Sequence, residues 1–350
     1  MLYEQLPVMD GVLLETENGL KEFAGSFFQH LKLPGAVRLK NSGIPLEHMA
    51  EVHRATQELF RCAHEEGAER FVRRAIGYER GYCPLWEETY KGAPKGPDEH
   101  RIGNYSEFWH IGLEKPDLPN VLPESLSNHS RVVLMHHQQC VQQLFVKLMR
   151  AFALHLGLPT LYFEDHAANG ETLLRVIRRP PVTDEARLVC SRQKPPFNIP
   201  PSAWPHNDTA VFTALSPAKG AGLWICILEQ DSSGRPRKRW VKADNEPNEA
   251  VIYPGYMCRV IASLAGIATN IVTHMVLTSE EAMGEERFSF PGFGHTVDEM
   301  DLLQIYNDLE ELHHHGVARP KWMNAVDPRW GALRYYGPHK LKVIMSHFGG

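Results

Sequence analysis

The chain has 350 residues, of which 43% are hydrophobic and 23% charged, so it can bury a sizeable core as one large domain or two modest ones. Its net charge of −5 argues against a general nucleic-acid binder, and no apolar stretch approaches the roughly 18 to 20 residues of a membrane helix. Six scattered cysteines without a Cys-x-x-Cys pair and a start without a signal-peptide pattern predict a cytoplasmic protein with reduced thiols. We expect a monomer or homodimer without nucleic-acid or membrane partners.

The first half of the chain is predicted to be mainly helical. Apolar side chains at helical spacing indicate three helices, over residues 19–33, from Pro45 to about residue 60, and over residues 130–156. A short apolar run over residues 35–39 is typical of a strand, and Gly157 is the expected end of the long helix. Residues 77–120 are irregular and rich in Gly, Pro and aromatic side chains.

After Gly170 the pattern changes to short β-type runs separated by Gly, Pro, Asn or Ser, as in an all-β sandwich or barrel. The expected strands cover residues 173–177, 209–215, 222–228, 249–253, 257–261, 271–277 and 287–293. Helical spacing returns over 297–312. We therefore expect an α+β chain with a mainly β core, in one integrated unit of three parts: a helical region over 1–165, the β core over 166–296, and a helical tail over 297–350.

His206 and Asp208 are the first candidate ligands for a metal ion. They lie two residues apart in a predicted extended segment, so their side chains point to the same side. One imidazole nitrogen and one carboxylate oxygen are thereby offered to a single ion. The pair alone is weak evidence, because two common polar residues meet at this spacing by chance in many proteins.

Two further elements follow in the same β-rich segment. His274 lies in a predicted strand, where the alternative is a core histidine that a neighbour satisfies. Arg287 and Ser289 share one face of the last predicted strand, and a guanidinium beside a hydroxyl suits a carboxylate of a dicarboxylic acid. The alternative is a surface arginine paired with Glu285 or Glu286.

This order of His-x-Asp, a later His and Arg-x-Ser resembles the Fe(II)/2-oxoglutarate-dependent dioxygenases, in particular the isopenicillin N synthase-like branch. The resemblance covers most of the chain, since four other segments are similar to family motifs: Asn-Ser-Gly-Ile-Pro at 41–45, Gly-Tyr at 77–78, Leu-Arg-Val-Ile-Arg-Arg-Pro-Pro at 174–181, and Tyr-Pro-Gly-Tyr-Met at 253–257. It implies a double-stranded β-helix, or jelly roll, with the metal at its open end, an N-terminal helical region and a C-terminal helix.

The resemblance also implies roles for the candidate residues. His206, Asp208 and His274 would bind Fe(II), and Arg287 with Ser289 would hold 2-oxoglutarate, the co-substrate used with O2. The expected reaction is hydroxylation, desaturation or cyclisation of a small, carboxylate-bearing metabolite, such as an amino acid or a natural-product intermediate, with release of succinate and CO2. Related halogenases have Gly or Ala at the carboxylate position, so Asp208 favours oxygen chemistry.

Candidate substrate contacts are Arg175, Arg178, Tyr78 and Phe108. The two arginines lie on the strand that faces the iron in relatives, and the two aromatic residues lie in the irregular segment that covers the pocket. Structural salt bridges and core packing are the competing interpretations. Ile177 and Arg178 replace an Asn and a Tyr of many members, so Arg178 could instead contact 2-oxoglutarate.

Two other functions remain open. Within the same branch, isopenicillin N synthase and the plant ethylene-forming oxidase use Fe(II) and O2 without 2-oxoglutarate. From another class, a jelly roll can bind a metal or a sugar without any redox chemistry. A binding module has no need of the Arg-x-Ser element, which favours the enzyme.

Overall fold

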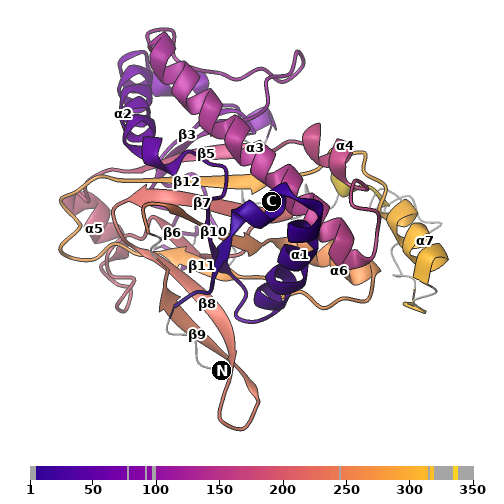
Figure 1. Cartoon of the computed structure of the whole chain (residues 1–350). Coiled ribbons are helices and arrows are strands. Elements are labelled where there is room, and N and C mark those ends of the chain that lie inside the picture. The colour runs from indigo at the N-terminus through magenta and orange to yellow at the C-terminus, as the bar shows by residue number, and fades with distance from the viewer. Residues whose placement is uncertain are drawn as a thin grey trace.

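Two β-sheets form the centre of this computed structural model, which describes residues 5–76, 79–90, 93–96, 100–243, 246–313, 316–318 and 334–337 (Figure 1). Eight strands form the larger sheet, in the order β1 (Val8–Asp10), β2 (Val37–Lys40), β10 (Glu249–Pro254), β7 (Phe212–Lys219), β12 (Arg287–Gly294), β5 (Leu173–Arg179), β4 (Glu107–Ile111) and β3 (Gly81–Cys83). Four strands form the smaller sheet, in the order β6 (Ala203–His206), β11 (Thr273–Val276), β8 (Leu223–Gln230) and β9 (Pro236–Lys242). The pairs are antiparallel except β1 with β2.

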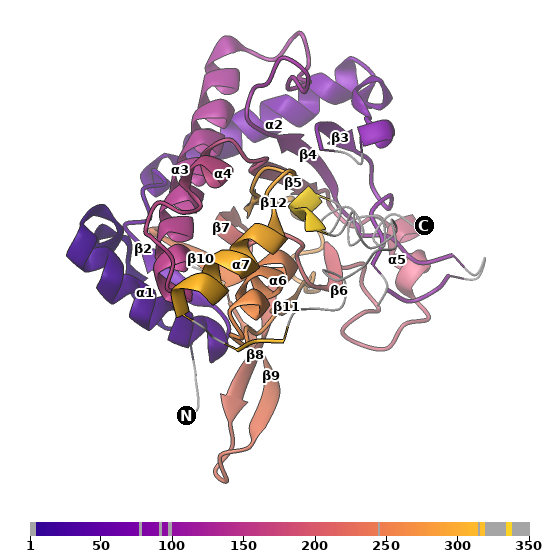
Figure 2. The ribbon, with the colours of Figure 1, turned by 90° about the vertical axis from the view of Figure 1, so that its right-hand side faces the viewer.

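Helices cover the outer face of the larger sheet (Figure 2). The three long ones are α1 (Glu17–Lys32), α2 (Met49–Glu65) and α3 (Asn128–Leu156), and α3 packs on β12, β5 and β4. Phe28 of α1 stacks on Phe152 of α3, which meets Phe212 of β7 edge to face, so aromatic side chains join the helices to the sheet. The long helix ends at Gly157, whose φ of 79° is a left-handed conformation that glycine adopts freely, as predicted.

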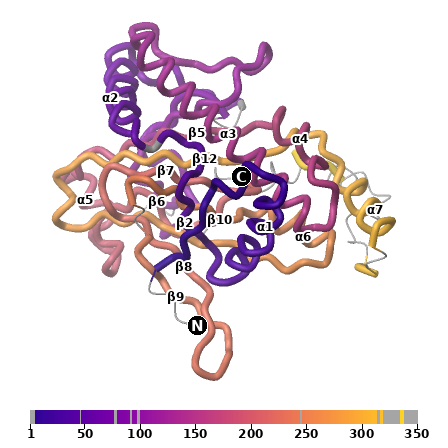
Figure 3. The backbone as a smooth tube through the Cα atoms, viewed as in Figure 1, coloured from indigo at the N-terminus to yellow at the C-terminus, as the bar shows by residue number. Residues whose placement is uncertain are grey.

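Four shorter helices complete the described secondary structure apart from single turns. They are α4 (Glu164–Ala168), α5 (Asp184–Cys190), α6 (Tyr256–Leu264) and α7 (Leu302–His313), and α7 packs on α6. The hairpin of β8 and β9 extends beyond the rest of the chain (Figure 3). In the described part of the chain, no helix combines the length and the apolar composition that crossing a membrane requires.

The two faces of β5 have different surroundings, and this difference positions the site. Leu174 and Val176 belong to the hydrophobic core beneath the helices, whereas Arg175 and Ile177 line a cavity on the opposite face. Alternation of side chains along a strand produces this separation. The inner faces of both sheets therefore enclose the space in which a site can form.

Most predicted elements are confirmed, but two regions differ. Residues 257–261, expected as a strand, belong to helix α6, because an apolar run this short fits both the strand and the helix period. Strands β3 and β4 lie within the segment expected to be irregular. Strands from the first 111 residues join the same sheet as those of the β core. The division of the chain near residues 165 and 296 stays a prediction.

Candidate metal centre

His206 and Asp208 lie at and just after the end of β6, where the backbone is held by the start of α6. The N–H of Tyr256 donates a hydrogen bond to the carbonyl of Asp208 at 2.8 Å. A Cβ atom at Gly255 would overlap a neighbouring backbone carbonyl, so this close approach requires glycine. The loop that carries the carboxylate is thus fixed by backbone contacts.

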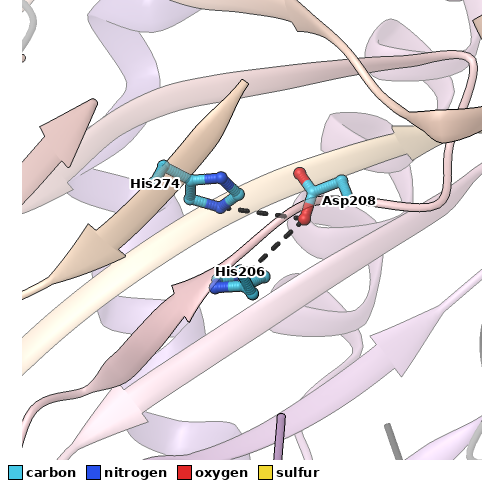
Figure 4. A group of neighbouring side chains, drawn as sticks. All are labelled: His206, Asp208 and His274. Carbon is cyan, nitrogen blue, oxygen red and sulfur yellow. Dashed lines mark ion pairs between the residues drawn. The ribbon is translucent and has the colours of Figure 1, made fainter. Parts of the chain in front are cut away.

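His274 lies on β11 directly opposite His206 on β6, so both imidazoles project from the same face of the smaller sheet. Nε2 of His206 is 3.5 Å from Oδ1 of Asp208, and Nε2 of His274 is 3.7 Å from the same oxygen (Figure 4). One ligand atom from each residue lies within 4.8 Å of the others, and no other such group occurs among the described residues. The structure therefore brings the three predicted residues together in the arrangement of a two-His, one-carboxylate site.

Neighbouring groups orient these ligand atoms. Nδ1–H of His206 donates to the carbonyl of Trp204 at 2.7 Å, which leaves the lone pair of its Nε2 facing Asp208. The hydroxyl of Thr213 donates to Oδ2 of Asp208 at 2.6 Å and leaves Oδ1 toward the histidines. The phenol oxygen of Tyr253 lies 3.1 Å from Nε2 of His274. The arrangement leaves Nε2 of His206 and Oδ1 of Asp208 for a metal, whereas Nε2 of His274, which also faces Asp208, is shared with the hydroxyl of Tyr253.

The electrostatics of the three residues also suit a cation. Burial lowers the pKa of His274 to about 4, with His206 adding to the decrease and Asp208 opposing it, so the imidazole is neutral at neutral pH. Burial alone would raise the pKa of Asp208, but His274, His206 and Thr213 outweigh it and hold this pKa well below its usual range. A buried carboxylate beside a neutral His274 lacks a full countercharge. A divalent cation would supply that charge, so the residues present fit a bound metal.

The three residues open into a cavity between the two sheets. Its walls come from β5, β7, β10 and β12 of the larger sheet, from β6, β8 and β11 of the smaller sheet, and from the segment between Glu88 and Phe108.

Arg287 and Ser289 line the same cavity, on the inner face of β12. Arg287 is buried, with 5% of its surface exposed, and its Nε donates to the carbonyl of Ala221 at 3.2 Å. Ser289 lies opposite Ile177 of β5. The predicted pair is therefore placed with the metal candidates, and its binding of 2-oxoglutarate stays a prediction.

The four candidate substrate contacts are placed differently from one another. Arg175 and Phe108 line the cavity. Arg178 does not, because it lies three residues after Arg175 and so projects from the opposite face of β5. Tyr78, with the Gly-Tyr motif that contains it, lies outside the described residues.

Arg178 instead forms a partly buried ion-pair network beneath helix α2. Its Nη1 is 2.5 Å from Glu107, and its Nε donates to Glu286 at 2.8 Å. Glu107 also meets Nε2 of His64 at 3.1 Å and accepts a hydrogen bond from Tyr82 at 2.5 Å. These contacts support the structural salt-bridge interpretation of Arg178 and give it no path to the cavity.

The irregular segment supplies cavity residues that the sequence did not indicate. Glu88, Tyr90 and Asn104 line the cavity, and the ring of Tyr90 stacks flat on that of His206, with centroids 4.0 Å and planes 4° apart. Tyr253 is a fourth such residue, at the end of β10. No periodicity or motif marks Glu88 or Asn104, whereas Tyr253 could have been found as the residue before the Pro254-Gly255 turn.

Comparison with known proteins was made on sequence and on structure. No family model matches the chain. Homoarginine-6-hydroxylase 2-ODD-233 of Oryza sativa is 28% identical over 238 residues, which span 65% of this chain and 65% of that protein. The chain spans less than two thirds of the length of the curated relatives that it matches, with values of 62% and 65%.

Solved structures show the fold more completely. A full-length protein of Neurospora crassa, in complex with alpha-KG and thymine, aligns with a TM-score of 0.70 at 18% identity, covering 97% of this chain and 96% of its own. A 2OG-Fe(II) oxygenase family protein from Caulobacter crescentus aligns with a TM-score of 0.65 at 21% identity, covering 87% and 91%. The jelly-roll prediction is confirmed by this likeness, and the isopenicillin N synthase-like branch stays a prediction.

Proposed function

We propose that this chain, which has the fold of the 2OG-Fe(II) oxygenases, is an Fe(II)- and 2-oxoglutarate-dependent oxygenase that oxidises a small molecule and releases succinate and CO2. The proposal rests on one observation, which is that metal ligands and an Arg–Ser pair suited to a carboxylate lie in the same cavity. His206, Asp208 and His274 form a set of metal ligands, and Arg287 with Ser289 lies in the wall of the same space. A bare metal-binding module would not require the second pair.

The protein's own part is binding, orientation and charge balance. Bound Fe(II) would supply the activation of O2. His206, Asp208 and His274 would hold the ion at the wall of the cavity, and the cavity beside them would admit 2-oxoglutarate and O2. Arg287 would pair with the distal carboxylate, and the hydroxyl of Ser289 would donate to it.

The carboxylate of Asp208 helps to choose between oxygenation and halogenation. By the family resemblance, a carboxylate at this position favours oxygen chemistry over halogenation. Hydroxylation, desaturation and cyclisation all agree with the residues present, and none of the three is preferred.

The substrate is proposed to be a small molecule that contacts Arg175 and Phe108. The names of the relatives, which mention homoarginine and thymine, support this class. The carboxylate that we expected on the substrate rests on the sequence resemblance alone. Arg175 already pairs with the carboxylate of Glu88, and the charges of this pair affect which substrates can bind beside it.

Formation of succinate tests the proposal. Protein supplied with Fe(II), 2-oxoglutarate and O2 should form succinate in step with consumption of one compound from a panel of amino acids, nucleobases and their derivatives. The His274→Ala variant should form none, although its circular dichroism should match that of the wild type. Consumption of a panel compound without 2-oxoglutarate would instead favour the oxidase of the isopenicillin N synthase type.

A further inference from the structure

Arg175 is a buried guanidinium with one side still available to a ligand. Its Nε donates to Nε2 of His110 at 2.7 Å, and its Nη1 contacts both oxygens of Glu88, at 2.8 and 3.1 Å. Its Nη2 has no partner among the described residues, although the side chain is only 13% exposed and lines the cavity. Two N–H bonds of a buried cation are therefore available to an acceptor in that cavity.

Glu88 neutralises this cation from within the protein. The carboxylate is buried, with 5% of its surface exposed, and its Oε2 also accepts hydrogen bonds from Tyr90 at 2.8 Å and from Asn104 at 2.9 Å. The backbone N–H of Asn104 donates to the carbonyl of Glu88 at 2.8 Å, so residue 88 is held in place by its main chain as well. The Arg175–Glu88 pair is therefore a fixed part of the cavity wall with no net charge.

This pair lies close to the metal candidates. Tyr90 donates to Glu88 with its hydroxyl and stacks its ring on His206, so one side chain links the pair to a metal ligand. A molecule anchored at Nη2 of Arg175 would thus lie in the part of the cavity that contains His206. Arg287 is not needed for this contact, because it lies on β12 and is the proposed partner of 2-oxoglutarate.

The surroundings of Arg175 are flat and apolar. Its guanidinium lies 3.9 Å from the ring centroid of Phe108 and 5.0 Å from that of Phe293. Ile177 lines the same wall. Aromatic walls of this kind favour a planar or apolar body with few polar atoms.

We propose that Nη2 of Arg175 is the substrate anchor and that it takes an uncharged acceptor oxygen, the carbonyl of an amide, lactam or ureide carried on a flat body. This inference rests on the proposed function for the identity of the site as a substrate pocket. A substrate carboxylate would place a second negative charge beside Glu88 in a space with apolar walls, where the repulsion is poorly screened. A carbonyl makes the same hydrogen bonds without that cost, and this differs from the carboxylate expected from the sequence.

The test compares benzamide with benzoate, which differ in charge but not in ring size. Binding of each probe is measured by calorimetry to the protein alone and to the protein loaded anaerobically with Fe(II) and 2-oxoglutarate. Benzamide should bind about tenfold more tightly than benzoate, since only benzoate adds a second negative charge beside Glu88. Tighter binding of benzoate, or binding of neither probe, would overturn the proposal.

Two variants separate the anchor from general effects of charge. Arg175→Lys keeps the charge but lacks the second guanidinium nitrogen, so benzamide should bind about tenfold more weakly. Arg178→Lys is the matched control, because this arginine lies on the opposite face of the same strand, and benzamide affinity should stay unchanged. Equal effects of the two variants would contradict a specific role for Arg175.

Glu88→Gln tests the role of the internal countercharge. This variant keeps an acceptor for Arg175 and removes the negative charge, so benzoate affinity should rise about tenfold relative to benzamide. An unchanged ratio of the two affinities would show that Glu88 does not select against carboxylates. If the protein does not bind Fe(II) and 2-oxoglutarate, the proposed function is wrong. The affinities of benzamide and benzoate for the protein alone would still decide whether Arg175 is the substrate anchor.

Discussion

The two ends of the cavity are built in different ways. At the metal end, His206 and His274 are neighbours across one antiparallel pair of strands, and Asp208 follows two residues after the first of them. At the other end, Glu88 and Arg175 are 87 residues apart and meet through an irregular segment. Strand pairing positions the two histidines and backbone contacts to α6 fix the loop with Asp208, whereas tertiary packing alone positions the second set. We therefore expect substitutions at the metal end to remove function, and those at the other end to alter which molecule binds.

The largest effect is expected at Asp208. Asp208→Ala removes the charged ligand and should weaken binding of Fe(II) or Co(II) by more than about a hundredfold, since changes at residues behind a metal ligand already cost 10- to 100-fold. Metal titration followed by absorbance measures this. Asp231→Ala, in the turn of the projecting hairpin, is the control and should bind metal like the wild type. Full metal affinity in Asp208→Ala would place the metal elsewhere.

Substitutions of Arg287 should change the affinity for 2-oxoglutarate without changing the affinity for the metal. Arg287→Gln should weaken 2-oxoglutarate binding by about a hundredfold, because a bidentate charged contact is lost, and should leave metal affinity unchanged. Arg287→Lys, which keeps the charge without the fork, should be intermediate. Calorimetry with 2-oxoglutarate checks both variants. Equal affinity in all three proteins would assign the carboxylate to another residue.

A substitution at Thr213 tests whether its hydrogen bond to Asp208 contributes to metal affinity. Thr213→Val removes the hydroxyl that donates to Oδ2 of Asp208 and should weaken metal binding about tenfold. Thr172→Val is a matched control, since this buried hydroxyl has no partner among the described residues. The same metal titration compares them. A similar loss in both variants would indicate a general packing effect.

The smallest effect is expected on the outer face of β5, away from the cavity. The hydrogen bond and charge of Glu107 raise the pKa of His64 above 6.5, although burial opposes this. A raised pKa stabilises the fold below the unfolded value and ceases to do so as the pH rises through the folded value. His64→Gln should therefore lower the free energy of unfolding by a few tenths of a kcal/mol near pH 6, because the side chain is 47% exposed, and not at about pH 9.

Urea unfolding of His64→Gln at the two pH values measures this difference. Metal and 2-oxoglutarate affinities should match those of the wild type, because His64 lies on the far side of the sheet from the cavity. A change in either affinity would show that the two faces of β5 are coupled.

The metal end could be predicted from the sequence because side chains along a strand return to the same face every two residues. His206, Asp208 and the Arg287–Ser289 pair follow from that spacing once the segments are recognised as β. The same rule separates Arg175 from Arg178, since residues three apart in a strand lie on opposite faces. Because Arg175 faces the cavity, the rule places Arg178 outside it.

The remainder could not be predicted from local patterns. The run 257–261, with four apolar residues and Arg259, is short enough to satisfy both the strand and the helix period, and only the packing of Met257 and Ile261 in the hydrophobic core distinguishes the two. Glu88 and Asn104 have no signal in the sequence, because their partners are set by how the irregular segment folds over the strands. Residues of this kind line the cavity, and only the complete fold places them there.

The most direct measurement is the visible absorption of the protein with Fe(II) and 2-oxoglutarate in the absence of O2. Chelation of the metal by the keto acid should produce a charge-transfer band in the wild type. The band should be absent in Asp208→Ala and should require about a hundredfold more 2-oxoglutarate in Arg287→Gln. A wild-type protein that binds Fe(II) but shows no band at saturating 2-oxoglutarate would contradict the proposed function.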